Sequence, residues 1–458
     1  MSTPLEISAR VRVTTGEMAY GPHAVARLDG KVLFVRGAAP DEEIEAVVRE
    51  TRERFAFADV AAVLRPSIAR RPAPCPYLPR CGGCPWQHLD YAAQLTAKHA
   101  IVREQLRRIA GLDLTTAAVL PSPREYAYRR RIKLRVADGV VGFHAAASHA
   151  LIPVEHCLLA EPAVDAAIEW AAALVRALVS KLRRVEVSSA GADARVVVAG
   201  EVEGALLEGD ATRAAAWLAA HQGVAGLVLG GRGWVRSWGD VTTGLTPEEG
   251  AALVVHAPGF TQVNREGNRV LVATVLAAAE AQPGQRVLDL YAGAGNLSLP
   301  LRRRGALVTA VEQDRGAAAD ARANAAREAG PPLRVIAERA ERAAARLADA
   351  GEAFDVVVLD PPRGGAAGCM AALLQLRPAR IVYVSCNPAT LARDLRALRG
   401  SYTVDTVQPI DLFPHTYHVE TVVRATLSCD AGTPGVSSFR RHGPIAPPRR
   451  RRARRRPT

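Results

Sequence analysis

Short runs of alternating apolar and polar residues fill the first part of the chain, from about residue 8 to residue 64. Examples are KVLFVRG and EIEAVV, and glycines and prolines separate the runs. A period of two is typical of strands with one buried face, and many short strands at this spacing predict a small closed β-barrel. We place this barrel at residues 1–66. The next segment, PSIARRPAP at 66–74, indicates a linker.

The pattern becomes mixed in the middle of the chain, at residues 75–255. A helix is expected at about 91–109, and strand-like runs follow in IKLRVADGVVGF and ARVVVAGEVEG. This mixture predicts a central α+β domain, although the pattern does not give the order of its strands.

From about residue 256 to residue 428, apolar strands alternate regularly with helices. The strand runs are RVLDL, LVTAVEQD, FDVVVLDPPR and RIVYVSCNP, and a helical pattern follows each of them. This rhythm predicts an α/β, Rossmann-like domain in which helices cover both faces of a parallel sheet, and such sheets bind ligands at the carboxyl ends of their strands. Four residues with charged or reactive side chains fall at those ends: Asp289, Glu312, Asp360 and Cys386.

The net charge of +13 and the pI near 9.9 favour a polyanionic partner. Nine arginines and one acid give residues 429–458 a charge of +8, so the rest of the chain is only mildly basic. This tail is predicted to be disordered, as either a solubilising end or a non-specific phosphate contact. No apolar stretch is long enough for a membrane helix, and the N-terminus lacks the apolar core of a signal peptide. We expect a cytoplasmic monomer without a membrane partner.

The turn after RVLDL, YAGAGN at 291–296, is typical of a site where the backbone closely approaches a ligand. Ser298 stands where a dinucleotide-binding fingerprint has its third glycine, which favours a nucleoside cofactor over one with a pyrophosphate. Glu312 ends the next strand, where a carboxylate can accept both hydroxyls of a ribose; the alternative is a solvated charge. These features together fit S-adenosylmethionine. The two prolines after Asp360 make the segment DPPR stiff and fix the carboxylate at the crevice.

Cys386 ends an apolar strand and immediately precedes a helix. Asn387 is a suitable N-cap, and Pro388 suits the first helical position. The dipole of that helix should favour the thiolate and lower the thiol pKa, whereas the alternative is a buried, inert cysteine. A thiolate that adds to C6 of uracil makes C5 nucleophilic enough to take a methyl group, after which a base must remove the C5 proton.

Four further cysteines form a group with one close pair and one distant member: Cys75, Cys81, Cys84 and Cys157. Disulfides are not expected in a cytoplasmic chain. Four thiolates fit either an iron–sulfur cluster or a structural zinc ion, and the presence of only one close pair favours iron. Cys369 and Cys429 have no such context and are expected to be inert.

Few residues of the sequence are candidates for contact with RNA. The run Arg129–Arg131 follows Tyr126 and Tyr128, so it could grip phosphates with aromatic rings available for stacking; the alternative is a solvated edge strand. Phe260 could stack on a flipped base or simply pack against its neighbours.

Four motifs occur together: CPYLPRCGGCPWQH with the later EHC; GFTQVN; DLYAGAGN; and DPPR with SCNP and HTYHVE. In this combination the chain, from Glu17 to about Leu427, resembles the RNA 5-methyluridine methyltransferases of the iron–sulfur, TRAM-domain type, the RumA-like 23S rRNA enzymes. The resemblance implies that Cys386 is the nucleophile and that Glu420 is the base that removes the C5 proton. It also implies that five residues contact the cofactor: Gln262, Tyr291, Asn296, Glu312 and Asp360.

The same resemblance implies that the barrel is a TRAM domain, an OB-like RNA-binding module. It further implies that the group of four cysteines holds a structural 4Fe–4S cluster, and that the substrate is 23S rRNA in preference to tRNA. One position departs from the family, in which an Asp or Asn is often found near the adenine. This chain has Glu338 and Arg339 there, so we leave that contact unassigned.

Three alternatives stay open. Cytosine-C5 methylation of RNA also uses a cysteine adduct, but those enzymes carry two cysteine motifs where this chain has one strand-end cysteine. RNA binding without catalysis is disfavoured by the presence of both Cys386 and Glu420. His418 is the rival to Glu420 as the base, because strand alternation would place both side chains on one face.

Overall fold

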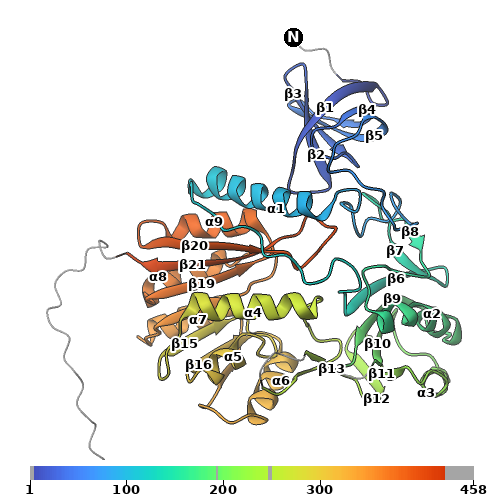
Figure 1. Cartoon of the computed structure of the whole chain (residues 1–458). Coiled ribbons are helices and arrows are strands. Elements are labelled where there is room, and N and C mark those ends of the chain that lie inside the picture. Colours follow the sequence, from blue (N-terminus) through green and yellow to red (C-terminus); the bar gives the residue numbers. More distant parts are fainter. Residues whose placement is uncertain (1–4, 192–193, 246–249, 429–458) are drawn as a thin grey trace, which may run out of the picture.

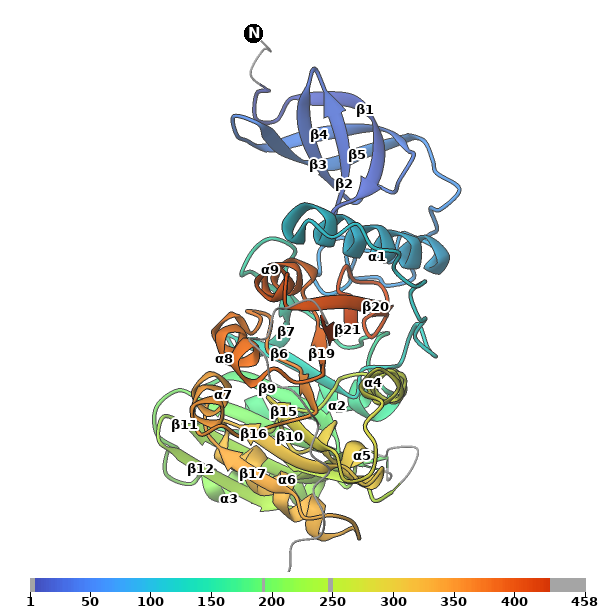
Figure 2. The same cartoon turned by 90° about the vertical axis from the view of Figure 1, so that its left-hand side faces the viewer.

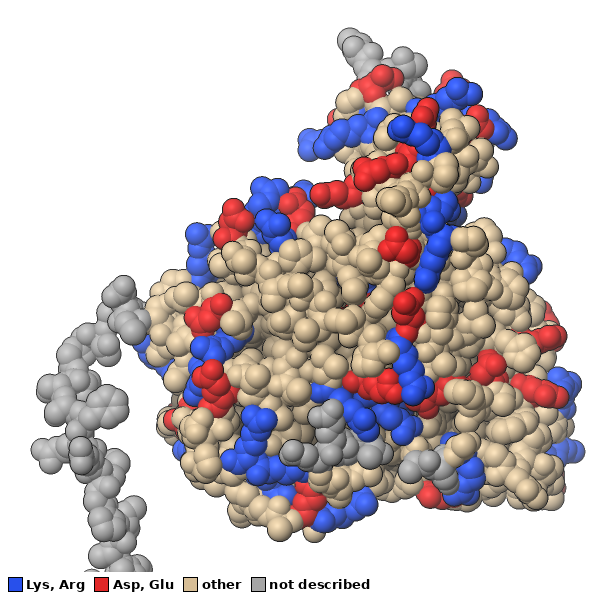
Figure 3. Space-filling model, viewed as in Figure 1, with Lys and Arg blue, Asp and Glu red and all other residues tan. Residues whose placement is uncertain are grey.

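The computed structural model describes residues 5–191, 194–245 and 250–428. The arginine-rich tail and Cys429, which the sequence analysis singled out, lie outside these residues. Figure 1 shows a barrel at one end of the molecule, a central sheet on one side and a second sheet with its helices on the other. On the face drawn in Figure 3, acidic and basic side chains are mixed over the upper part, and basic side chains gather in the lower part.

The N-terminal barrel is confirmed. Its strands close in the order β1-β2-β3-β5-β4. Their bounds are β1 (Arg10–Met18), β2 (His23–Leu28), β3 (Lys31–Arg36), β4 (Glu43–Thr51) and β5 (Phe55–Arg65). Alternate residues of each strand fill the interior, as with Leu33 and Val35 of β3, because successive side chains of a strand point to opposite faces.

The central part of the chain forms a seven-stranded sheet in the order β12-β11-β10-β9-β6-β7-β8. The strands are β6 (Arg131–Ala137), β7 (Val140–His144), β8 (Leu151–Pro153), β9 (Leu182–Ser189), β10 (Val196–Val202), β11 (Val224–Gly231) and β12 (Trp234–Gly239). Helices α2 (Pro162–Ala177) and α3 (Asp210–Ala220) pack against this sheet. A hairpin of β13 (Thr242–Leu245) and β14 (Leu253–His256) leads into the last domain.

The last domain has a seven-stranded sheet in the order β17-β16-β15-β18-β19-β21-β20. Its strands are β15 (Arg286–Leu290), β16 (Leu307–Glu312), β17 (Arg334–Ala337), β18 (Val356–Leu359), β19 (Arg380–Ser385), β20 (Tyr402–Ile410) and β21 (Glu420–Leu427). The helices are α4 (Arg265–Ala279), α5 (Ser298–Arg303), α6 (Arg315–Ala326), α7 (Ala340–Asp349), α8 (Met370–Leu376) and α9 (Pro388–Leu398). The Rossmann-like prediction is confirmed for the parallel strands, whereas β21 runs antiparallel to both of its neighbours, which the sequence did not predict.

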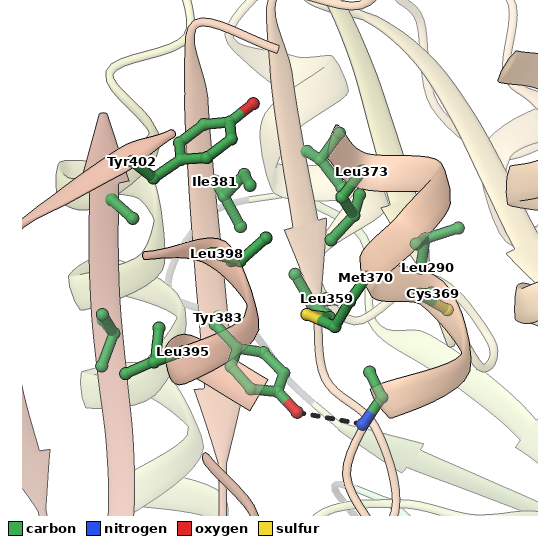
Figure 4. Close-up of a cluster of buried hydrophobic side chains, with 14 of the residues drawn as sticks. Leu290, Leu359, Cys369, Met370, Leu373, Ile381, Tyr383, Leu395, Leu398 and Tyr402 are labelled. Carbon is green, nitrogen blue, oxygen red and sulfur yellow. Dashed lines mark hydrogen bonds between the residues drawn. The ribbon is translucent and has the colours of Figure 1, made fainter. Parts of the chain in front are cut away.

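Side chains from the sheet and from its helices interlock in the core of this domain. In Figure 4, Leu359 and Ile381 of the sheet lie among Leu373 of α8 and Leu395 and Leu398 of α9. Strand β18 is buried along its whole length, as expected for a central strand with helices on both faces. The core therefore fixes where the strands end, and those ends carry the candidate site.

Helix α1 (Tyr91–Gln105) continues into a π-helical turn (Leu106–Ala110) and joins the barrel to the last domain. Ala97 and Ile101 pack into the core of the barrel, whereas Val102 and Leu106 pack into the core of the last domain. Both views show α1 beneath the barrel (Figures 1 and 2). Within the described part of the chain, none of the helices combines the length and the apolar character that crossing a membrane requires.

A buried ion pair fixes α1 to the last domain. The Lys98 Nζ donates to Asp411 Oδ1 at 2.6 Å and to the carbonyl of Phe413 at 3.1 Å, and neither charged side chain is exposed. The linker segment is also held, because Arg70 pairs with the buried carboxylate of Glu42 in the barrel. Because α1 also packs into the core of the barrel, the barrel is held close to Asp411 and Phe413, which precede β21 in the chain.

Lys98→Met should lower the free energy of unfolding by about 3–5 kcal/mol, because it leaves the Asp411 carboxylate buried without its cation. Urea denaturation measures this loss. Lys98→Met combined with Asp411→Leu should recover most of it, since an apolar pair has no charge to desolvate. An unchanged denaturation midpoint for Lys98→Met alone would contradict a structural role for the pair.

Candidate active site

A cavity lies at the carboxyl ends of β15 and β18, next to the point where the strand order reverses. Four of the five predicted cofactor contacts line it: Gln262, Tyr291, Asn296 and Asp360. The turn between β15 and α5 forms one wall. Gly293 of this turn has φ +55°, and no atom lies within 4 Å of the position that a Cβ would take. The backbone there is open to a ligand, as the glycine-rich motif predicts.

Glu312 supports this turn from the end of β16. Its Oε2 accepts a hydrogen bond from the backbone N–H of Gly293 at 2.9 Å, and its Oε1 accepts one from Asp314 at 2.7 Å. The side chain is half-buried and engaged with the backbone, so it is not a freely solvated charge. Each carboxylate oxygen keeps a second lone pair that can accept from a ribose hydroxyl.

Two residues that the sequence analysis did not assign to the cofactor also shape the cavity. Asn268 of α4 and Asn296 exchange two amide hydrogen bonds of 2.9 Å, which hold the Asn296 side chain at the cavity wall. Asp289 is fully buried, and burial raises its pKa to about 7, with Asp360 and Glu312 adding to the effect and the Ser298 hydroxyl opposing it. Its Oδ1 has no hydrogen-bond partner among the described residues.

The hydroxyl of Tyr291 interacts with other residues of the protein. Its hydroxyl donates to Glu341 Oε1 at 3.1 Å and lies 3.4 Å from the Cys369 Sγ. The hydroxyl therefore bonds within the protein, although Tyr291 is one of the residues that line the cavity. Cys369 is buried and supports this arrangement.

Cys386 lies between β19 and α9, with the helix capping that the sequence predicts. The Asn387 Oδ1 accepts from the Ala389 N–H at 3.1 Å, and Pro388 occupies the first turn of α9. The Asn387 amide also donates to the carbonyl of Arg363 at 3.2 Å. This bond joins the DPPR segment after β18 to the strand end that carries the thiol.

The predicted lowering of the Cys386 pKa is wrong for the free protein. Burial raises the pKa of this thiol to about 12, and the nearby carboxyls of Glu420 and Asp360 add to the effect. The Arg363 guanidinium acts in the opposite direction. The helix dipole that the prediction relied on is outweighed, because desolvation and two acidic neighbours all disfavour a third negative charge.

Glu420 is the first residue of β21 and is buried beside the thiol. Burial raises its pKa well above the usual range, and Asp360 adds to the rise, while Arg363 opposes it. Burial also raises the pKa of Asp360, to about 7. The Glu420 Oε1 has no hydrogen-bond partner among the described residues. A buried carboxyl with a free oxygen is suited to exchange a proton with a bound substrate.

His418 does not share a strand face with Glu420, so the alternation argument for this rival base is wrong. β21 begins at Glu420, and His418 belongs to the preceding segment. Its Nε2 lies 3.1 Å from the guanidinium of Arg363. Burial first, and Arg363 second, lower the pKa of His418 to about 3. The His418 imidazole is therefore neutral at physiological pH, and its Nε2 already faces a hydrogen-bond donor, the Arg363 guanidinium.

Tyr20 of the barrel also reaches this site, and no feature of the sequence indicated it. The residue lies between β1 and β2, and its hydroxyl donates to the carbonyl of Cys386 at 3.3 Å. Its ring meets that of Tyr417 edge-on, with 5.7 Å between centroids. The indole N–H of Trp86, which is fully buried, donates to the carbonyl of Gly21 at 3.1 Å and holds this turn in place.

The four cysteines of the predicted cluster come together from two segments. Cys75 and Cys157 act on the pKa of Cys81, and Cys157 and Cys81 act on that of Cys84; the pKa values of Cys81, Cys84 and Cys157 are raised, chiefly by burial. The Arg129 guanidinium opposes that rise at all three. In the part of the chain that the structure describes, no three or more Cys, His, Asp or Glu residues are placed to hold a single metal ion.

The prediction for the arginine run needs correction. Arg130 is completely buried and donates to the carbonyls of Gly244 and Ser189, so it is neither a phosphate grip nor part of a solvated strand. Arg131 is also buried, pairs with Glu186 and lies over the ring of Phe260 at 5.2 Å. These arginines serve to join the central sheet to the last domain. Phe260, in contrast, is 64% exposed at the mouth of the cavity.

A largely parallel sheet with a cavity at the carboxyl ends of its strands, beside a thiol and a buried carboxyl, fits the class of S-adenosylmethionine-dependent methyltransferases. The model of the tRNA (uracil-5-)-methyltransferase family matches residues 255–426. The chain is 35% identical to the 23S rRNA (uracil(1939)-C(5))-methyltransferase of Thiobacillus denitrificans, over 87% of this chain and 96% of that protein. It is also 35% identical to the enzyme of the same name from Nitrosospira multiformis, over 87% of this chain and 94% of that protein. The chain therefore belongs to the family of RNA uracil-C5 methyltransferases.

A solved structure agrees with this assignment. The Pyrococcus abyssi tRNA (uracil-54, C5)-methyltransferase, in complex with S-adenosyl-L-homocysteine, superposes with a TM-score of 0.69 at 25% identity, over 91% of this chain and all of that one. The similarity extends across the barrel, the central sheet and the methyltransferase domain.

Alkylation of Cys386 tests the correction to its pKa. The thiolate is the reactive form, so its rate of reaction with iodoacetamide in the free protein should rise about tenfold per pH unit between pH 7 and pH 9. Mass spectrometry of the peptide that contains Cys386 measures the rate, and Cys386→Ser gives the background. A rate that levels off below pH 8 would show the lowered pKa that the helix dipole alone predicts.

Proposed function

We propose that this protein transfers a methyl group from S-adenosylmethionine to C5 of one uridine in 23S rRNA, the uridine that its relatives' names number 1939. The relatives that support this substrate are 35% identical and align with nearly their whole length. The tRNA enzyme from Pyrococcus abyssi is less similar, at 25%. The observation that carries the proposal is the placement of Cys386, Glu420 and Asp360 together, beside the cavity.

The residues around the cavity fit S-adenosylmethionine. The open backbone at Gly293 and the carboxylate of Glu312 suit the nucleoside, while the ring of Tyr291 offers an apolar wall. Asp360 and Gln262 lie where they can hold the amino acid part of the cofactor or the base of the substrate. When bound, the cofactor supplies an electrophilic methyl group on a positively charged sulfur.

Cys386 and Glu420 divide the reaction between them. The Cys386 thiolate forms a bond to C6 of the uracil, and the electron pair of the C5–C6 double bond moves into an enolate. C5 then takes the methyl group. Glu420 removes the C5 proton, the double bond forms again, and the bond between sulfur and C6 breaks to release the thiolate. The C5 proton is replaced by the methyl group, the Cys386 thiolate is regenerated, and Glu420 keeps the proton until solvent takes it.

Ionisation must precede these steps, because the pKa values of both the thiol and Glu420 are raised in the free protein. Arg363 is the resident group that favours the charged forms, since it lowers the pKa of each. Assembly of the complex therefore activates the nucleophile, and the thiol stays unreactive before that. Tyr20 holds the backbone of Cys386 through its hydroxyl and so helps to position the thiol.

Cys75, Cys81, Cys84 and Cys157 are proposed to hold a 4Fe–4S cluster with a structural role. Four thiol donors and the compensating charge of Arg129 support this choice. The segment that carries three of these cysteines also contains Trp86, which binds the barrel turn beside Tyr20. A cluster at this point would fix the barrel relative to the thiol of Cys386.

In the Glu420→Gln variant, Cys386 should still form its bond to C6 of the uracil, and C5 should still take the methyl group. The reaction should then stop, because the C5 proton has no acceptor. The enzyme–RNA adduct should appear as a shifted band on a denaturing gel after incubation with the rRNA fragment and labelled cofactor. The control is the double variant with Cys386→Ala, which cannot form the adduct. Normal turnover by Glu420→Gln, with the adduct found instead in His418→Asn, would transfer the role of base to the histidine.

Protein purified without oxygen should contain about four irons per chain, as a cubane held by four thiolates requires. Metal analysis of Cys84→Ser should show the iron lost, together with a lower urea midpoint. Cys369→Ser is the matched control, because that buried cysteine lies outside the group and should leave the iron in place. One zinc per chain without iron would refute the assignment.

A further inference from the structure

The cation of the active site stands on the arginine loop, our name for residues 363–366, in which two glycines follow Arg363. The Arg363 guanidinium lies 3.1 Å from Nε2 of His418. Its charge opposes the rise in the pKa of both Cys386 and Glu420. Arg363 is exposed, and a long exposed side chain retains much rotamer freedom. The position of the guanidinium relative to the thiol therefore depends on how firmly the loop backbone is held.

Helix α9 holds the backbone of the arginine loop at its first residue. The carbonyl of Arg363 accepts a hydrogen bond from the Asn387 amide at 3.2 Å and one from the Thr390 hydroxyl at 3.3 Å. Asn387 is the N-cap of α9, Thr390 belongs to its first turn, and Cys386 comes immediately before them. The segment that carries the thiol therefore also fixes the start of the loop.

The buried carboxylate of Asp394, one turn further along α9, holds the other end of the arginine loop. Its Oδ2 accepts from the Ala366 N–H at 2.7 Å and from the Tyr383 hydroxyl at 2.7 Å. The Ala366 N–H also points at the Tyr383 oxygen at 3.1 Å, a contact that Figure 4 draws as a dashed line. Asp394 is 2% exposed. Burying a carboxylate is unfavourable unless its oxygens are hydrogen-bonded, so these bonds hold the loop and the helix together.

Arg393 links the same carboxylate to the middle of the loop. Its guanidinium pairs with Asp394 Oδ1 at 2.7 Å and donates to the carbonyl of Gly364 at 2.9 Å. Gly365 has φ +77°, and a Cβ there would lie 2.6 Å from both the Arg393 guanidinium and Asp394 Oδ2. Only glycine allows the backbone to approach the helix so closely. The loop is thus bonded to α9 along its whole length.

A buried charge at this position is better suited to fixing one geometry than to stability. Asp394 belongs to α9, and Leu391 and Leu395 of the same helix pack in the core of the last domain. At such a position a buried ion pair is often less stabilising than apolar residues that fill the same space. A fully bonded carboxylate, however, admits a single arrangement of its donors, and here two of these donors belong to the loop or contact it.

We propose that Asp394, Tyr383 and Arg393, which we call the clamp, position the active-site cation Arg363. None of the three is among the residues that line the cofactor cavity, so they act through the arginine loop. This proposal rests on the function proposed above, in which the Cys386 thiol must ionise before it adds to the uracil. With the loop fixed, the guanidinium stays where it stabilises the thiolate. With the loop released, the guanidinium moves toward solvent, and its effect on the thiolate falls with distance.

The test uses the full-length enzyme and two substitutions that keep the shape of the clamp. Tyr383→Phe removes one hydroxyl, and Asp394→Asn removes the charge. Tyr402→Phe is the matched control, because the buried Tyr402 hydroxyl donates to the carbonyl of Pro378 at 2.9 Å in the same domain. Each substitution is made in the unchanged enzyme and again together with Arg363→Met. The urea midpoint shows which variants are folded.

Alkylation of Cys386 by iodoacetamide at pH 8 measures the thiolate in the free protein, without substrate or cofactor. Tyr383→Phe and Asp394→Asn should each slow it about threefold, the change in thiolate fraction that a pKa rise of about half a unit produces. The kcat for methylation of the rRNA fragment should fall in parallel, while the KM for S-adenosylmethionine stays within about twofold. With Arg363→Met already present, neither substitution should slow alkylation further, since the clamp acts through that side chain.

Alkylation rates and kcat values equal to those of Tyr402→Phe would overturn the proposal, because the clamp would then serve stability alone. Further slowing in the Arg363→Met background would also overturn it, since the clamp would then act on the thiol without the arginine. Tyr383→Phe, which changes neither charge nor packing volume appreciably, decides the question if Asp394→Asn does not fold. Failure of the proposed function gives a different result: the unchanged enzyme would not methylate the rRNA fragment, whereas the alkylation rates need no substrate.

Discussion

The burial of Glu420 beside Asp360 and Cys386 is the constraint on which the rest of the active site depends. All three groups become anions when they ionise, and they share one desolvated pocket with Arg363 as the nearby cation. Each therefore disfavours the charge of the others. The pKa values of Cys386, Asp360 and Glu420 are all raised as a result, and Arg363 opposes the rise at Cys386 and Glu420.

The direction of one strand makes this pocket possible. Asp360 and Cys386 stand at the carboxyl ends of parallel strands, whereas Glu420 begins β21, which runs antiparallel to β19. The start of β21 thus lies at the same edge as the end of β19, with Ser385 opposite Thr421. From the other side, Tyr20 closes against the backbone of Cys386. Residues from the barrel and from the methyltransferase domain meet at one thiol.

Whether a feature of the site could be predicted from the sequence depends on whether it arises from a regular local pattern or from contacts between residues far apart in the chain. Parallel strands end at one edge of a sheet, so Asp360 and Cys386 could be placed together from the βαβ pattern alone. Tyr20 could not, because 366 residues separate it from its partner Cys386 and nothing in its own segment indicates the contact. The predicted direction of the pKa shift of Cys386 was wrong for a similar reason. Capping by Asn387 is local, but burial and carboxyl neighbours arise only in the folded chain. Arg130 likewise gave no local sign that it would be enclosed.

The central claim is that this protein methylates C5 of a single uridine of 23S rRNA through Cys386. The most direct test is to map 5-methyluridine in the 23S rRNA of cells whose only copy of the gene encodes Cys386→Ala. The account predicts that the one uridine loses its methyl group, that every other 5-methyluridine in rRNA and tRNA is unchanged, and that the unaltered gene restores the modification. Full methylation of that uridine in the Cys386→Ala cells would contradict the account.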